Sequence, residues 1–141
     1  VQTINNYYSS PVEKHVAPSD VLFLATHEPC TLCSSAITWA GFDNFYYFFS
    51  HEDSRDSFSI GHDLKILKEV FKHDPGGYAR ENTYWTGYGI CDLIDNCEPV
   101  DGTGFRQRAA ALRDTYQQLS DRYQQRKGQG RSGDPAFIPL G

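Results

Sequence analysis

The chain has 141 residues, a formal net charge of −5, and contains 39% hydrophobic and 14% aromatic residues. This length and composition fit one globular domain and exclude a disordered chain. No apolar run approaches the roughly 20 residues that span a bilayer, and the first residues lack the basic and apolar regions of a signal peptide. We therefore expect a cytoplasmic protein without a membrane segment.

The first half of the chain alternates helix and strand patterns. Apolar side chains at helical spacing over residues 1–8 indicate the later turns of a helix. The apolar run Val21–Ala25 predicts a strand buried on both faces, and the aromatic run Asn44–Ser50 predicts a second strand. A helix is predicted over Cys30–Gly41, so the two strands should be parallel neighbours joined by a right-handed crossover. His51–Ser59 is polar and predicts a loop.

The second half continues this alternation. Residues 61–73 predict a helix that ends at the DPGG sequence, and residues 83–88 predict a further strand. A short helix is expected over residues 90–96. We divide the chain into a core over residues 1–100 and a segment over residues 101–141, an amphipathic helix followed by an irregular tail. The order of elements predicts an α/β fold.

Charge is distributed unevenly along the chain. Residues 105–141 carry seven Lys and Arg against three Asp and Glu, whereas residues 1–104 carry six against fifteen. The acidic body argues against wide non-specific binding of nucleic acid, which needs a basic surface. The basic segment is interpreted as a solvated helix face, with an RNA- or partner-binding arm as the alternative.

Two cysteines mark the start of the helix predicted over residues 30–41. Pro29 is favoured at or just before the first helical position, which places Cys30 and Cys33 in the first turn and on one face. We expect the amino end of the helix to lower the thiol pKa and so favour the thiolates that a metal needs. Two such thiolates form half of a tetrahedral zinc site.

The residues alone leave other interpretations open for these cysteines. The pair is also compatible with a thiol redox protein that uses Cys30 and Cys33, or with two buried, inert thiols. A structural zinc site that adds Cys91 and Cys97 has poor spacing, because five residues separate the second pair. A disulfide framework is disfavoured in a chain of this length without a secretion signal.

Residues 26–33, with the sequence THEPCTLC, resemble the second zinc motif of the cytidine deaminase superfamily. The T-x-E-P-C form is most similar to the branch of tRNA adenosine deaminases and guanine deaminases, and the resemblance covers about residues 1–73. It implies a three-layer α/β/α cytidine deaminase-like fold and a catalytic zinc held by Cys30 and Cys33. The implied activity is hydrolytic deamination of an amino-bearing nucleobase, nucleoside or nucleotide, with release of ammonia.

The chain departs from that family at its amino end. The family adds an upstream H-x-E or C-x-E motif, which supplies a third ligand and the glutamate that moves protons, yet no histidine here is followed two places on by Glu. The chain begins at Val1 and contains no Met. We therefore expect the first strands, the start of the first helix and the catalytic glutamate to lie upstream of Val1. A divergent site that uses His27 or His51 is the alternative.

The resemblance also suggests substrate contacts and partners. His51 and Asp53 lie where the family recognises the base, and Asp53 could accept a hydrogen bond from a ring or exocyclic N–H. Glu28 completes the predicted substrate-binding set, although the resemblance implies that its side chain braces the strand end. A small-molecule base or nucleoside is favoured over RNA, and a homodimer is expected because relatives in this branch usually pair. A non-catalytic zinc-binding module is the main alternative to an enzyme.

Overall fold

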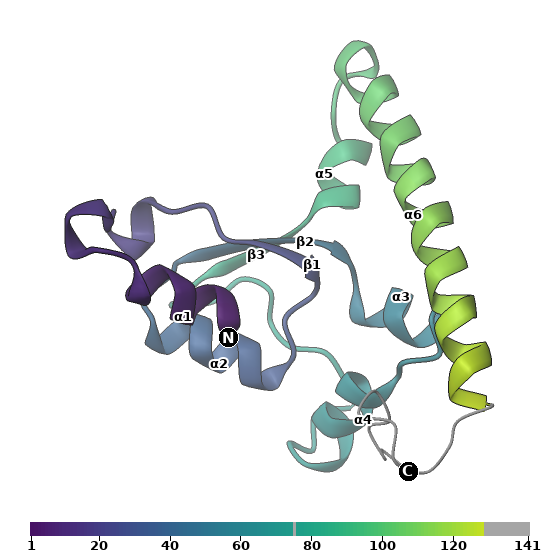
Figure 1. Cartoon of the computed structure of the whole chain (residues 1–141), viewed down its shortest axis with the longest axis horizontal. Helices are drawn as coiled ribbons and strands as arrows, with labels where there is room; N and C mark the ends of the chain where they lie inside the picture. Colours follow the sequence, from purple (N-terminus) through teal and green to yellow (C-terminus); the bar gives the residue numbers. More distant parts are fainter. Residues whose placement is uncertain (75, 129–141) are drawn as a thin grey trace.

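Three parallel strands form the centre of the structure, a computed structural model that describes residues 1–74 and 76–128. They are β1 (Leu24–His27), β2 (Asn44–Phe49) and β3 (Thr86–Gly89), in the order β1-β2-β3 (Figure 1). The α/β class and the parallel pairing of the first two strands are confirmed. β1 begins three residues later than predicted, because it is residues 24–27 that pair with β2.

Six helices surround the sheet in the described part of the chain. They are α1 (Gln2–Ser9), α2 (Thr31–Trp39), α3 (His51–Asp56), α4 (His62–Glu69), α5 (Ile90–Asp95) and α6 (Pro99–Gly128). Two single 3₁₀ turns, Val12–Lys14 and Pro18–Asp20, connect α1 to β1. None of the described helices has the length and apolar character needed to cross a bilayer.

The main core lies between the sheet and the first two helices. Ile4 of α1 and Ile37 of α2 pack against Phe45 and Tyr47, which point to the same face of β2. Phe23, Phe42 and Trp85 complete this buried cluster. Figure 1 shows α1 and α2 on one side of the sheet, whereas α5 and α6 lie toward its carboxyl end. The arrangement places the amino ends of α2 and α3 at the carboxyl ends of β1 and β2.

The prediction of a loop over His51–Ser59 is wrong, because α3 occupies its first six residues. A capping box begins this helix: the Ser50 hydroxyl accepts from the Asp53 amide, and the Asp53 carboxylate accepts from the Ser50 amide, both at 3.0 Å. The capping pattern that starts the helix spans only residues 50–53. The helix is short and mostly polar, so it lacks the apolar periodicity from which helices are inferred.

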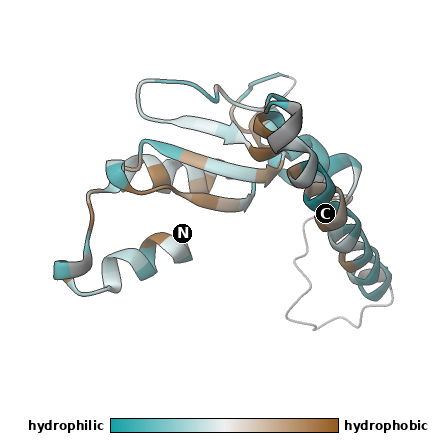
Figure 2. Ribbon diagram, turned by 90° about the horizontal axis from the view of Figure 1, so that it is seen from above, coloured by the Kyte–Doolittle hydropathy of each residue, from teal (hydrophilic) through white to brown (hydrophobic). Residues whose placement is uncertain are grey.

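α6 is the longest element and extends away from the sheet (Figure 1). It confirms the helix predicted after residue 100, whereas the predicted irregular tail from residue 129 onward lies outside the described residues. Its apolar positions remain about half exposed, as at Leu112 (56%) and Leu119 (51%). Figure 2 shows a mostly hydrophilic α6, with hydrophobic segments along the strands. An apolar groove of about 560 Å³ separates α6 from β1 and β2.

Candidate functional site

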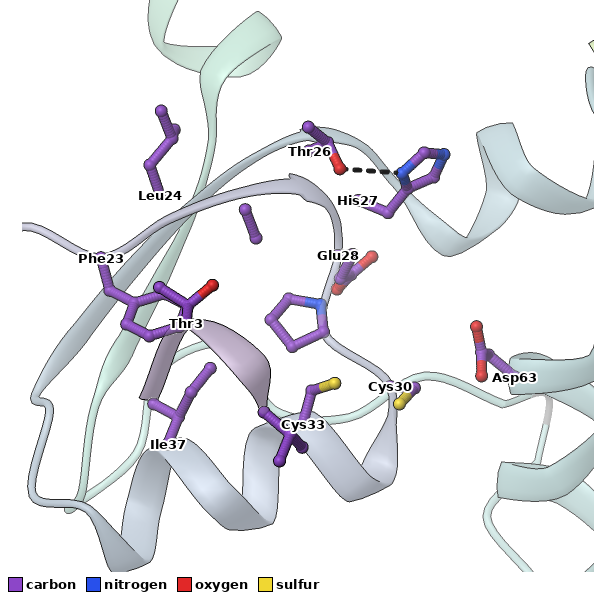
Figure 3. Close-up of a pocket in the computed structure, with 13 residues that line it drawn as sticks. Thr3, Phe23, Leu24, Thr26, His27, Glu28, Cys30, Cys33, Ile37 and Asp63 are labelled. Atoms are coloured by element: carbon purple, nitrogen blue, oxygen red, sulfur yellow. Dashed lines mark hydrogen bonds between the residues drawn. The ribbon is translucent and has the colours of Figure 1, made fainter. Parts of the chain in front are cut away.

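The cysteine pair opens α2, at the carboxyl end of β1. Cys30 is the N-cap residue, Pro29 precedes it, and Cys33 is the third residue of the helix. The first helical hydrogen bond runs from the Ser34 amide to the Cys30 carbonyl at 2.8 Å. The prediction that both thiols lie in the first turn is confirmed. Figure 3 shows both thiols beside the same cavity, close enough for Cys30 to act on the pKa of Cys33.

A cavity of about 460 Å³ lies in front of the two thiols. Ligand pockets in proteins have volumes of roughly 300–1,000 Å³, so this cavity is large enough for a small molecule. Its lining comes from α1, β1, α2 and α4, and includes Thr3, His27, Glu28, Ile37 and Asp63 (Figure 3). Asp63 was not predicted as a site residue. It lies 30 residues after Cys33, and no sequence motif connects it to the cysteine pair.

The amino end of α1 reaches this cavity. Val1 and Thr3 line it. The start of α2 faces the same space. Because the amino end of a helix carries partial positive charge and unpaired N–H groups, it favours a thiolate or another anion at the site.

The pKa of Cys33 is nevertheless raised. Burial is the largest cause, followed by the neighbouring Cys30 thiol. The expectation that the helix start lowers the pKa of this thiol is wrong for Cys33, because desolvation outweighs it. A protonated Cys33 is a poor nucleophile. A metal ion would displace the proton on binding.

His27 lies at the end of β1 with its ring among aromatic side chains. The ring centroids of Phe49 and Tyr116 are 5.1 and 5.0 Å away. Burial lowers the pKa of His27, and the charges of Asp53 and Asp63 offset only part of that effect. Its Nδ1 lies 3.3 Å from the Thr26 hydroxyl, and its buried Nε2 has no hydrogen-bond partner among the described residues. The ring is therefore neutral near pH 7.

The described residues hold no group of three or more His, Cys, Asp or Glu side chains placed to bind one metal ion. The four-cysteine alternative is therefore not formed in this part of the chain. Cys91 instead lies on α5, where its thiol is 3.8 Å from the Phe48 carbonyl and 3.4 Å from an Arg113 nitrogen. Cys30 and Cys33 are soft donors that fit zinc, and they supply two of its four usual ligands.

Glu28 is buried beside the cysteine pair, but its carboxylate is already hydrogen-bonded. Arg80 donates to both oxygens at 2.8 and 3.0 Å, and the His51 amide donates to one of them at 3.0 Å. These contacts connect the end of β1 to the start of α3. Arg80 follows Glu28 by 52 residues, and no local sequence pattern indicates the pair.

The structure separates the other two predicted substrate residues from the cysteines. His51 is 3% exposed, and it faces a second hollow of about 330 Å³ that also contacts Glu28 and Arg80. Its Nε2 is buried without a partner among the described residues. Asp53 lines neither space, because it caps α3 and pairs with Arg113. Substrate contacts by Glu28, His51 and Asp53 stay predictions.

Comparisons with protein-family models, with curated proteins and with solved structures found no match to this chain. The resemblance of residues 26–33 to a deaminase motif therefore receives no support from them. The functional argument depends on the residues of the site and on their geometry.

Proposed function

We propose that this chain is a zinc-binding hydrolytic deaminase with a three-layer cytidine deaminase-like fold. One observation carries the proposal: Cys30 and Cys33 share the first turn of α2 at the carboxyl end of a central parallel strand, in front of a cavity. In open α/β sheets, ligands bind outside the carboxyl ends of the strands. The substrate class, an amino-bearing nucleobase or nucleoside, follows from the motif resemblance.

The residues of the chain divide the tasks at this site. Cys30 and Cys33 would hold zinc, which when bound lowers the pKa of a water molecule and supplies a nucleophile near neutral pH. Phe23 and Ile37 form an apolar part of the cavity wall. Glu28 keeps its carboxylate in the bond network with Arg80 and is not free to move protons.

Two measurements test the proposal. Elemental analysis should find about one zinc per chain in the wild type and in Cys97→Ser, and much less in Cys33→Ser, since tetrahedral zinc loses one of its thiolates. Ammonia release should be seen with at least one of guanine, adenosine, cytosine and cytidine. Equal zinc in all three proteins would refute the site. Zinc without ammonia release would favour a non-catalytic zinc module.

A further inference from the structure

Two side chains from residues 78–80 form hydrogen bonds with the turn that precedes Cys30. The Tyr78 hydroxyl donates a hydrogen bond to the Pro29 carbonyl at 2.7 Å. The Arg80 guanidinium donates two hydrogen bonds to the Glu28 carboxylate, from Nε to Oε1 at 2.8 Å and from Nη2 to Oε2 at 3.0 Å. The two residues before the first cysteine are therefore each bonded to the segment 78–80.

This turn has few backbone bonds of its own. The Glu28 amide donates to the Phe49 carbonyl at 2.7 Å, and Pro29 has no N–H to donate. The Glu28 side chain is only 2% exposed, so its charge depends on its three donors. Arg80 supplies two of these three bonds. This bidentate pair is stronger than a single hydrogen bond and also fixes the plane of the carboxylate. Without Arg80, the carboxylate would keep only the His51 amide.

The segment that carries Tyr78 and Arg80 is itself held firmly. The Arg80 carbonyl accepts a hydrogen bond from the Gly87 amide of β3 at 2.7 Å. The Tyr78 ring packs edge-on against Trp85, with ring centroids 5.7 Å apart. Burial, and next the charge of Glu28, raise the pKa of Tyr78 well above its usual value, so its hydroxyl keeps its proton and remains a donor.

We propose that Tyr78 and Arg80 are positioning residues for the cysteine pair. By holding the Glu28–Pro29 turn to β3, they fix the N-cap position of α2, and hence where the Cys30 thiol stands relative to the Cys33 thiol. The expected effect on metal affinity rests on the proposed zinc function. The expected effect on the spacing of the two thiols does not depend on zinc, and a thiol reagent measures it separately.

Cadmium binding measures the effect on the metal site, because cadmium thiolates absorb in the ultraviolet. In titrations of the full chain, Arg80→Gln and Tyr78→Phe should each weaken Cd²⁺ binding by up to about tenfold, the lower end of the loss when a direct partner of a metal ligand is removed, because both act on Cys30 through the turn before it. Arg80→Lys, which keeps the charge but loses the two-point geometry, should fall between the wild type and Arg80→Gln.

Two matched variants control for general loosening. Arg113→Gln removes a different two-point arginine–carboxylate pair, which joins α6 to α3. Tyr8→Phe removes a tyrosine–carbonyl hydrogen bond of 2.8 Å at the opposite end of α2, to Ala40. Neither contact touches the turn before Cys30, so both variants should bind Cd²⁺ as the wild type does. A similar loss in these controls would overturn the inference.

Capture of the thiols by phenylarsine oxide gives the independent measurement. The reagent forms two As–S bonds with a neighbouring pair of thiols and releases one water, and peptide mass spectrometry locates the adduct at residues 30 and 33. Capture should be several-fold slower in Arg80→Gln and Tyr78→Phe than in the wild type and the controls. Equal capture rates would overturn the positioning role. A wild type that captures the reagent but binds neither Cd²⁺ nor Zn²⁺ would overturn the zinc function alone.

Circular dichroism separates these outcomes from unfolding. If Arg80→Gln does not fold, Tyr78→Phe decides, because it removes one hydroxyl and keeps the ring contacts with Trp85 and His51. A folded Tyr78→Phe with wild-type capture and wild-type Cd²⁺ affinity would refute the role of Tyr78 in positioning.

Discussion

Arg113 of α6 forms a two-point ion pair with Asp53 of α3, 60 residues earlier in the chain, through bonds of 2.8 and 3.1 Å. The guanidinium also lies 5.6 Å from the ring centroids of both Phe48 and Phe49. Two glutamines of the same helix extend this attachment, since Gln117 donates to the Ser57 carbonyl and Gln124 to the Phe58 carbonyl. α6 is thus fixed to the segment 53–58 by one charged and two neutral contacts.

Replacing Arg113 should loosen α6. We expect Arg113→Gln to lower the free energy of unfolding by about 1 kcal/mol, a value kept small because both side chains are partly exposed and solvent screens their charges. Urea denaturation followed by circular dichroism measures the change. Arg108→Gln, at an exposed position of the same helix, serves as the control and should change stability by less than about half as much. Equal effects would contradict a specific role for the ion pair.

The same ion pair predicts that the stability of the protein falls at acidic pH. Burial alone would raise the pKa of Asp53, but hydrogen bonds from Arg113 and the Ser50 amide, together with the Arg113 charge, lower it. A carboxylate whose pKa falls on folding stabilises the protein above its unfolded pKa, near 3.8, and loses that effect as pH falls through the folded pKa. The stability difference between the wild type and Asp53→Asn should shrink in urea titrations from about pH 5 to about pH 3.

His27 predicts a second change of stability with pH, in a higher pH range. Because burial lowers its pKa below 6.5, the unfolded chain takes up a proton more readily than the folded one. Its contribution to stability is fully present above about pH 6.5 and is lost as pH falls toward the folded pKa. Asp53 and Asp63, the charged groups that act on the ring, only reduce this effect. His27→Leu should flatten the stability profile between about pH 7 and 5, and an unchanged slope would refute this assignment.

Gly87 of β3 should tolerate no side chain. A Cβ atom there would lie 2.6 Å from two ring carbons of Phe45, which is fully buried. Gly87→Ala should therefore destabilise the protein by about 1–3 kcal/mol in chemical denaturation. When Gly87→Ala is present, Phe45→Leu should destabilise the protein less than it does alone. A double-mutant cycle measures this coupling.

Gly104 provides the matched control for this substitution. It lies within α6, and a Cβ atom there would meet no atom within 4 Å. Gly104→Ala should raise stability by about 0.5–1 kcal/mol, because alanine favours a helix more than glycine does. A loss of stability at both positions would show that the crowding at Phe45 is not the cause of the effect at Gly87.

Local patterns predicted the elements that have a strong periodic or apolar signal. The aromatic run of β2 was recognised because Phe45, Tyr47 and Phe49 point into the core. The start of α2 was placed by Pro29 and the two cysteines. α3 was missed because its helix depends on the Ser50–Asp53 capping box and carries no apolar stripe. An element was predicted where its local sequence signal is strong, whatever its length.

The candidate site was predictable only where it is local. Cys30 and Cys33 lie within one turn, so their proximity follows from helix geometry. The cavity in front of them is closed by Val1, Asp63 and other residues that the fold brings from four elements. The bonds from Tyr78 and Arg80 span 49 and 52 residues, and no spacing rule connects them to the cysteine motif. Tertiary contacts of this kind leave no pattern in a single sequence.

The long separation between the cysteine turn and its supports has a consequence during synthesis. Chains grow at about 5–20 residues per second, so roughly 2.5–10 seconds pass between translation of Pro29 and translation of Tyr78, 49 positions later. Throughout that interval the two thiols exist without the contacts that order the turn around them. Premature oxidation to a disulfide would therefore compete with folding on the ribosome, and a reducing environment during translation should increase the yield of folded protein.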